Sequence, residues 1–169
     1  MKHKLTLHNR ATDPSAYMNV STLIFDLVDM VSKNGNFLLD IGPRADGSIV
    51  ETEANTLREA GKWIHAHSEA IFNTTYWFVT PEVGAHIRFT QTNEAFYIFT
   101  FEKPVNGTLR VEAPVPVLEG DEITMLGSKN GSMALDWSKD NDGYLTVDVP
   151  RTLVESEDTC WVFKVAYGM

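Results

Sequence analysis

An amphipathic helix runs directly into a short apolar strand between Leu23 and Pro43 (LIFDLVDMVSKNGNFLLDIGP). Apolar residues recur every three or four positions up to Val31, which predicts a helix with one core-facing side, and Asn34-Gly35 ends it. Phe37–Ile41 is mostly apolar without alternation, which is typical of a strand buried on both faces. Such a strand needs hydrogen-bonded neighbours on its edges, and no strand precedes it here. The pattern indicates the last part of a larger α/β structure.

Two helices are predicted around this strand. The first begins after Ser21, a residue type that caps helix N-termini well. The second begins at a capping box, in which Glu51 reaches back to the backbone of Ser48, and it runs to about Ala70. Its inward positions follow the helical period and are Leu57, Ala60, Gly61 and Ile64. Helix, strand and helix together form part of a repeating α/β unit.

From Tyr76 onward, the period of the apolar residues changes from helical to alternating. Short strands are predicted around Phe78 and at 87–89, 96–101, 109–111, 123–126, 135–137, 144–147 and 161–165. Asp142-Gly143, between two of them, is a strong hairpin signal. This spacing predicts an antiparallel β-sandwich and hence an α+β fold class. We place the domains at residues 1–76 and 77–169, and expect the second to fold alone whereas the first needs a partner.

The 169-residue chain is acidic, with a formal net charge of −9. We therefore exclude nucleic acid as a partner, because phosphate binding requires clustered Lys and Arg. No apolar run approaches the roughly 18 residues that a membrane span needs, so no membrane association is predicted. Cys160 is the single cysteine, which rules out an intrachain disulfide, and its apolar surroundings predict a buried thiol.

Four Asn-x-Ser/Thr sequons occur, at Asn19, Asn73, Asn106 and Asn130. Chance would give about one or two, and occupied sequons lie on surface loops of secreted proteins. We therefore expect an extracellular parent glycoprotein. Its signal peptide would lie upstream, because the opening MKHKLTLHNR lacks an apolar core.

Two clusters superficially resemble metal sites. His65 and His67, followed by Glu69, are spaced two apart, whereas zinc ligands on one helix are four apart, so we predict a solvated helix face. Asp140–Gly143 lacks the Glu that completes a calcium loop, which favours a hairpin turn. The sequence also lacks phosphate-binding loops and the usual serine or zinc hydrolase motifs. No metal site is predicted.

Asp40 is the candidate for a residue close to a substrate. It lies near the end of the apolar strand, and in a barrel of α/β units the carboxyl ends of the strands face the active site. An acidic side chain in this setting needs a partner. Asp40 therefore either holds the neighbouring loop through backbone N–H groups or faces the substrate. In that loop, Arg44 and Asp46 are predicted to be turn residues or a local ion pair.

Three tryptophans, Trp77, Trp137 and Trp161, lie in the predicted sandwich. Flat aromatic rings pack on sugar faces, so exposed members would form a sugar-binding platform. Their alternating sequence contexts favour instead a place in the core.

The run Leu27–Ile49 (LVDMVSKNGNFLLDIGPRADGSI) resembles a segment of the α-L-fucosidases of glycoside hydrolase family 29. Leu57–Ile64 and Glu69–Trp77 are similar to the next segments of that family, with the same order and spacing. The most specific part is VSKNGN-LL-IGP, within which Asp40 stands where many members have Asn. The resemblance extends from about residue 10 to the end of the chain.

The resemblance implies a (β/α)8-type barrel followed by a β-sandwich, of which this chain holds the final helix-strand-helix piece and the sandwich. It implies a retaining hydrolase that releases α-linked L-fucose from fucosylated glycans without a metal or organic cofactor. The nucleophile and the acid/base residue precede the matching segment, so we expect no catalytic residue here and an inactive isolated chain. The N-terminal barrel portion is the implied partner. A carbohydrate-binding module and a barrel-completing subunit are the alternatives.

Overall fold

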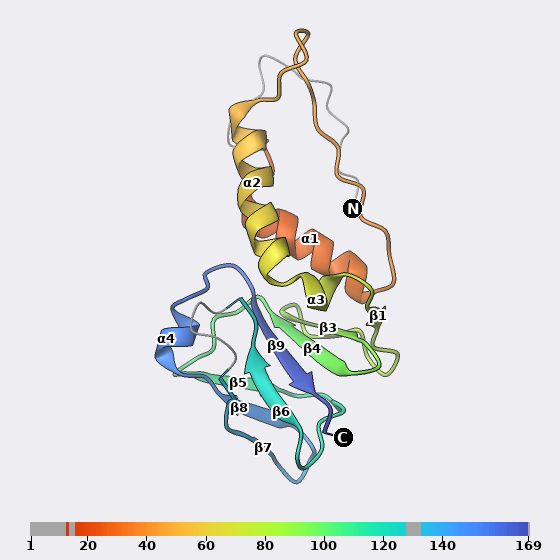
Figure 1. Ribbon diagram of the computed structural model, residues 1–169, viewed down its shortest axis with the longest axis vertical. Helices are drawn as coiled ribbons and strands as arrows, with labels where there is room; N and C mark the ends of the chain where they lie inside the picture. Colours follow the sequence, from red (N-terminus) through yellow and green to blue (C-terminus); the bar gives the residue numbers. More distant parts are fainter. Residues whose placement is uncertain (1–12, 14–15, 128–132, 169) are drawn as a thin grey trace.

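The computed structural model describes residues 13, 16–127 and 133–168, which form stacked layers of helices and two sheets (Figure 1). The helical layer consists of α1 (Val20–Ser32), α2 (Glu51–Ala66) and α3 (Ser68–Ile71). It lies against a six-stranded antiparallel sheet, and a three-stranded antiparallel sheet covers the other face of that sheet. The predicted α+β class, with helices followed by an antiparallel sandwich, is confirmed.

The larger sheet has the strand order β1-β3-β4-β9-β6, with β2 beside β3, and the smaller sheet has the order β5-β8-β7. The strands are β1 (Thr75–Tyr76), β2 (Glu82–Val83), β3 (Ile87–Gln91), β4 (Ala95–Thr100), β5 (Thr108–Val111), β6 (Glu122–Met125), β7 (Trp137–Lys139), β8 (Leu145–Asp148) and β9 (Trp161–Ala166). A fourth helix, α4 (Arg151–Val154), precedes β9.

Most predicted strands form within two residues of their expected bounds. The strand predicted around Phe78 is wrong, because β1 and β2 form on either side of that residue.

The turn between β7 and β8 is a hairpin turn, as predicted. The N–H of Gly143 donates to the carbonyl of Asp140, and Gly143 has a φ of 80°. One carboxylate oxygen of Asp140 accepts the N–H groups of Asp142 and Tyr144, both at 3.0 Å. The carboxylate that suggested a calcium loop is therefore used to hold the turn.

The first apolar core lies between the two sheets. Alternate residues of β4 and β9, among them Phe96, Ile98 and Phe163, point into it and are fully buried. Leu145 and Val147 of β8 face them from the smaller sheet. Complete burial of an aliphatic or aromatic side chain of this size contributes about 1.5–3 kcal/mol. This is the core that the alternating sequence pattern predicts.

A second apolar core lies on the opposite face of the larger sheet, under the helices. Tyr97, Phe99 and Val162 point to this face, and Phe99 and Val162 lie directly opposite each other in the ladder. The helical layer covers them with the buried residues Leu23, Ile24, Val28, Ala60, Trp63, Ala70 and Ile71. The larger sheet is therefore buried on both faces, which explains why all of β4 is inaccessible.

Two buried hydrogen bonds between a side chain and the backbone join the helical layer to the sheet region. The indole Nε1 of Trp63 donates to the carbonyl of Cys160 at 3.2 Å, and the hydroxyl of Thr90 donates to the carbonyl of Ala70 at 2.7 Å. Both contacts are buried, where an unpaired polar group costs about 1–3 kcal/mol. The expectation that the sandwich folds alone overlooks this interface, because removal of the helices would expose an apolar sheet face.

A network of four charged side chains closes one end of the same interface. The guanidinium of Arg88, on β3, is almost fully buried and donates from Nε to Asp29 of α1 at 2.6 Å. Its Nη2 lies 3.2 Å from Glu82, and Lys33 lies 2.8 Å from both carboxylates. Arg88 also stacks over the ring of Phe25. Each charge in the network thus has two opposite partners, which makes the burial of Arg88 tolerable.

The helix N-termini differ from the sequence-based predictions. Asn19, not Ser21, caps α1, because its side-chain oxygen accepts the N–H of Thr22 at 2.8 Å. The capping box at Ser48 does not form, and α2 begins without a side-chain cap. The helix predicted to run to Ala70 breaks at His67, which separates α2 from α3. The predicted helix end at Asn34 is confirmed, since this residue has a φ of 59°.

The predicted strand at Phe37–Ile41 does not form among the described residues. The segment has no ladder partner, and Leu38 is 91% exposed. In Figure 1 it runs as a bare connection apart from the sandwich between the ends of α1 and α2. The physical reason is that a strand forms only by pairing, and the described residues provide no strand beside this segment.

The second apolar core, between the helices and the larger sheet, predicts that the fragment of residues 77–169 cannot reach the native state alone. We expect it to bind a hydrophobic dye and to melt without cooperativity, because the faces of Tyr97, Phe99 and Val162 lose their cover. Dye fluorescence and calorimetry, with the 169-residue chain as control, measure this. A compact, cooperatively melting fragment would contradict the importance of the helical layer.

The charge network predicts that Asp29→Asn lowers the free energy of unfolding by about 1–3 kcal/mol, because Arg88 then keeps only one carboxylate partner. Glu112→Gln, which breaks the exposed pair with Arg110, is the matched control and should lower the free energy of unfolding clearly less than Asp29→Asn does. Burial raises the pKa of Asp29, but hydrogen bonds from Lys33 and Arg88 outweigh it and hold the pKa below 3.8.

The contribution of Asp29 is therefore present above pH 3.8 and is lost as the pH falls below that value. Urea unfolding at pH 7 and pH 3 measures both effects. Equal losses in the two variants at pH 7 would show that the network contributes no more than a surface ion pair.

Candidate functional site

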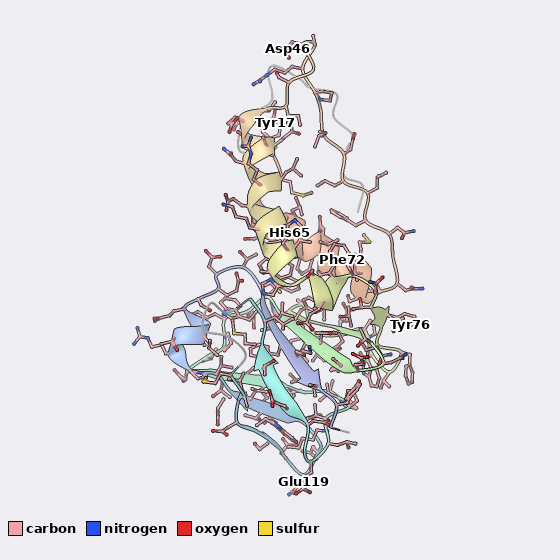
Figure 2. The ribbon with its side chains drawn as sticks, viewed as in Figure 1. Tyr17, Asp46, His65, Phe72, Tyr76 and Glu119 are labelled. Carbon is pink, nitrogen blue, oxygen red and sulfur yellow. The ribbon has the colours of Figure 1, made fainter. Side chains whose placement is uncertain are left out.

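The loop from Pro43 to Ser48 is closed by its own hydrogen bonds. The N–H of Arg44 donates to the carbonyl of Ser48 at 2.8 Å, and the N–H of Gly47 donates to the carbonyl of Arg44 at 2.9 Å. Asp46 accepts both the N–H and the hydroxyl of Ser48. Hydrogen bonding from Ser48 holds the pKa of Asp46 below 3.8. Arg44 and Asp46 are thus turn residues, and Asp46 lies at the tip furthest from the sandwich (Figure 2).

Asp40 lies in the unpaired segment before this loop and is exposed. Its carboxylate has no hydrogen-bond partner among residues 13, 16–127 and 133–168. The role of holding the loop through backbone N–H groups therefore has no support in these contacts. Its placement next to the substrate stays a prediction, since the carboxyl end of a barrel strand is defined only when the neighbouring strands are present.

His67 differs from the sequence-based prediction of a solvated helix face, whereas His65 agrees with it. His65 is exposed, but the side chain of His67 is only 1% exposed because the helix breaks at this residue. The imidazole stacks on Trp63, with ring centroids 4.3 Å apart. In the part of the chain that the structure describes, no three His, Cys, Asp or Glu side chains are grouped to hold a metal.

The three sandwich tryptophans do not form a sugar-stacking platform. Trp161 is buried and donates from its indole to the carbonyl of Val154. Trp77 and Trp137 are half-buried against the core between the sheets.

Cys160 is buried as predicted, and burial together with the charge of Glu157 raises the pKa of its thiol well above the ordinary value.

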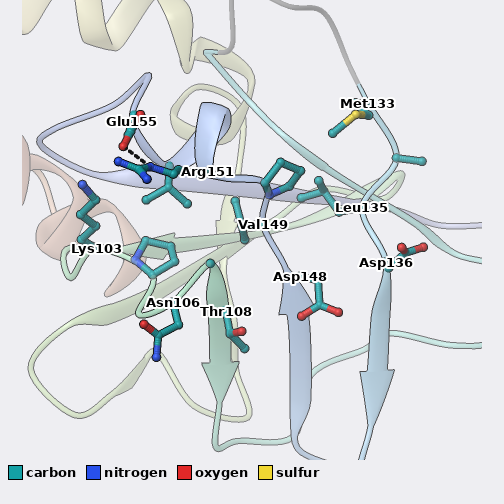
Figure 3. A pocket seen from close by; sticks show the side chains of 15 residues that line it. Lys103, Asn106, Thr108, Met133, Leu135, Asp136, Asp148, Val149, Arg151 and Glu155 are labelled. Atoms are coloured by element: carbon teal, nitrogen blue, oxygen red, sulfur yellow. Dashed lines mark hydrogen bonds and ion pairs between the residues drawn. The ribbon is translucent and has the colours of Figure 1, made fainter.

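An open groove of about 900 Å³ lies on the sandwich beside α4 (Figure 3). Asp136 and Asp148 line it from adjacent strand ends, and Asn106 and Arg151 lie on its rim. None of the described residues that line it is aromatic. Both aspartate side chains are exposed.

The described carboxyl groups with a clear pKa shift all shift downward. They are Asp29, Asp46, Asp140 and Glu155. Hydrogen bonds from backbone or charged neighbours dominate at Asp140 and Glu155, which are on the surface. A glycosidase acid needs the opposite, a carboxyl whose pKa is raised so that it keeps its proton near neutral pH. None of these four carboxyl groups has a pKa shifted in that direction.

The sequons occupy different settings. Asn19 caps α1, whereas Asn73 and Asn106 are exposed turn residues with positive φ. Asn130 lies outside the described residues.

None of the helices in the described ranges is both long and apolar enough to cross a bilayer.

Comparisons with known proteins agree with the layer arrangement. Residues 5–69 match the α-L-fucosidase family, and residues 80–166 match the α-L-fucosidase C-terminal domain. Tissue α-L-fucosidase of Homo sapiens is 36% identical over 132 residues, which are 78% of this chain and 28% of that protein. The α-L-fucosidase of Dictyostelium discoideum is 39% identical over 72% of this chain and 26% of its own length.

A solved structure is similar over nearly the whole chain. The α-fucosidase of Thermotoga maritima, solved in complex with fucose, superposes with a TM-score of 0.78 at 25% identity, covering 94% of this chain and 37% of that one. The present chain thus spans roughly a third or less of these three proteins. It belongs to the α-L-fucosidases of glycoside hydrolase family 29, and it corresponds to the C-terminal portion of their catalytic domain together with their C-terminal domain.

Proposed function

We propose that this chain is the non-catalytic C-terminal part of a retaining α-L-fucosidase that releases α-linked L-fucose from fucosylated glycans. The carrying observation is that both family matches occur, in order, in a chain that covers only 28% of the human tissue enzyme. A retaining glycosidase needs two carboxyl groups about 5–5.5 Å apart, one of them a nucleophile and the other an acid and base. We assign both to the region of the parent enzyme that precedes the matched segment.

The unpaired segment Phe37–Ile41 supplies the last barrel strand in this proposal. It has no ladder partner among the described residues, and the side chain of Leu38 is 91% exposed. Met30 and Ile49, on either side of it in the chain, are also exposed. A neighbouring strand from the rest of the barrel would pair with this segment and bury these apolar side chains. We infer that this surface binds the upstream barrel portion, either within one polypeptide or between two subunits.

The loop from Pro43 to Ser48 would then lie at the mouth of the barrel. Loops that follow barrel strands form the active-site face, and this one is already closed by internal hydrogen bonds. Its shape does not depend on the rest of the barrel. The chain would contribute a rigid rim, with Asp40 beneath it, rather than a reacting group.

A carbohydrate-binding module is the weaker alternative. The groove beside α4 has polar side chains, but stacking aromatic rings are absent from the described residues that line it. Titration of the chain with a fucosylated glycan, and of Trp137→Ala beside it, distinguishes the two functions. The module would bind with an affinity that the substitution lowers, whereas our proposal expects no binding by either protein.

The isolated 169-residue chain should not hydrolyse 4-nitrophenyl α-L-fucoside, because it lacks the pair of carboxyl groups that form and break the covalent intermediate. Release of 4-nitrophenol is the measurement, with the complete human tissue enzyme as the positive control. Turnover by the pure chain above that of buffer would reject the proposal.

Co-expression with the upstream barrel region of a matched relative should restore turnover, and Leu38→Asp should reduce it at least tenfold by placing a charge in the strand interface. Leu118→Asp is the matched control, since Leu118 is also exposed but lies on the sandwich, and it should have no effect. Equal activities of the two variants would argue against this surface.

We also propose that the parent enzyme is extracellular and glycosylated. On expression in a secretory host, glycans are expected at Asn73 and Asn106, because both side chains lie on exposed turns. A glycan at Asn106 would cover the groove beside α4. Peptide mapping by mass spectrometry, with Asn73→Gln and Asn106→Gln as controls, measures occupancy. Unmodified asparagine at both positions would contradict the proposal.

A further inference from the structure

His67 lies at the joint where the helical layer meets the sandwich. It occupies the break between α2 and α3, and its ring is enclosed by Trp63 from the helical side. Gly127, just after β6, and Glu157, just before β9, approach it from the sandwich side. A side chain that can change its charge is thus buried between two layers that the fold must hold together.

The two ring nitrogens of His67 have different partners. Nδ1 lies 2.8 Å from the carbonyl oxygen of Trp63, which can only accept, so Nδ1 carries a proton and donates it. In a neutral ring, Nε2 is then an acceptor. It is buried and makes no hydrogen bond among the described residues, and Glu157 Oε2, at 3.9 Å, lies beyond hydrogen-bond distance. A proton on Nε2 would therefore be attracted by the charge of Glu157 but would be buried without a hydrogen bond in this arrangement.

Glu157 and Gly127 form the sandwich side of this site. Glu157 is only 15% exposed, and its other oxygen accepts the N–H groups of Asp158 and Thr159 at 2.9 and 3.1 Å. A Cβ atom on Gly127 would lie 2.5 Å from Nε2, and Gly127 has a φ of 73°, so only glycine fits there. The carboxylate and the ring are fixed opposite each other.

Burial and charge act on His67 in opposite directions. Burial lowers the pKa of His67 below 6.5 and outweighs the carbonyl of Trp63 and the carboxylate of Glu157, which raise it. The other groups that line the cleft at this joint include Glu59 and Lys62 of α2, which pair with each other at 2.7 Å, and Asp158 of the loop before β9. From α1 only uncharged side chains line it: Val20, Ser21 and Ile24.

We propose that His67 is a pH-sensitive latch between the helical layer and the sandwich. The neutral ring closes the joint, and uptake of a proton at Nε2 loosens it because the enclosed site solvates the imidazolium less well than water does. The folded state binds the proton less tightly than the unfolded state. The contribution of His67 is therefore complete above pH 6.5 and declines as the pH falls below it. This control would act on the layer that carries the strand Phe37–Ile41.

Carboxylate titration belongs to a different pH window, which makes the latch measurable. The carboxyl groups with lowered pKa values lose their contributions below pH 3.8 to 4.5. Between pH 7.5 and 5.5, the part of a fall in stability that His67→Asn removes therefore reports on His67. Each unit by which its pKa lies below 6.5 changes the unfolding equilibrium constant by up to about tenfold.

The test uses the full 169-residue chain. Nuclear magnetic resonance titration should place the pKa of His67 below that of His65, the exposed histidine two residues earlier. Urea midpoints should fall between pH 7.5 and 5.5 for the wild type and for the matched control His65→Asn. His67→Asn, whose amide can still donate to the Trp63 carbonyl, should remove most of that fall. Glu157→Gln should lower the pKa of His67 further.

Two results would overturn the latch: titration of His67 at or above the pKa of His65, or an unchanged pH dependence in His67→Asn. If that variant does not fold, the wild-type titration is decisive together with hydrogen exchange of the Trp63 indole. Its protection factor, held by the bond to Cys160, should fall severalfold from pH 7.5 to 5.5. Constant protection would contradict the proposal.

Discussion

The apolar outer face of the six-stranded sheet is the constraint on which the rest of the structure depends. A β-sandwich needs one apolar face on each sheet, but here β4 and β9 present apolar side chains to both sides. The second face must be covered, and α1, α2 and α3 cover it. The helices that match the catalytic domain of the family are thus also the layer that covers the outer face of the sandwich.

The polar contacts between the helices and the larger sheet determine how the helices are oriented on that sheet. The charge network of Arg88 holds α1 to β3, and the indole of Trp63 holds the end of α2 to the carbonyl of Cys160. Lys164 and Tyr97 bind Glu69 of α3. Apolar burial supplies most of the stability, whereas these pairs admit only one orientation of the helices.

Local patterns in the sequence predicted the elements well and their environment less well. The alternating strands, the turn at Gly143 and the helix end at Asn34 follow from side-chain chemistry within a few residues. The burial of His67 and the two-sided burial of β4 depend on residues distant in the chain, so periodicity alone could not reveal them. The continuous apolar run at 96–99 was the available signal for the second core. In Phe37–Ile41 the local sequence pattern is that of a strand, but no strand forms because the described residues provide no partner.

Amide hydrogen exchange of the 169-residue chain tests the central claim most directly, namely that the helical layer and the sandwich form one cooperative unit beside an unpaired strand. The account predicts that the amides of Phe99 and Val162 exchange only by global unfolding. The amides of α1, and those of α2 around Ala60 and Trp63, should exchange together with them. Leu38 and Leu39 should exchange as fast as in an unstructured peptide. Strong protection at Leu38 and Leu39, or exchange of the helices well before β4, would contradict it.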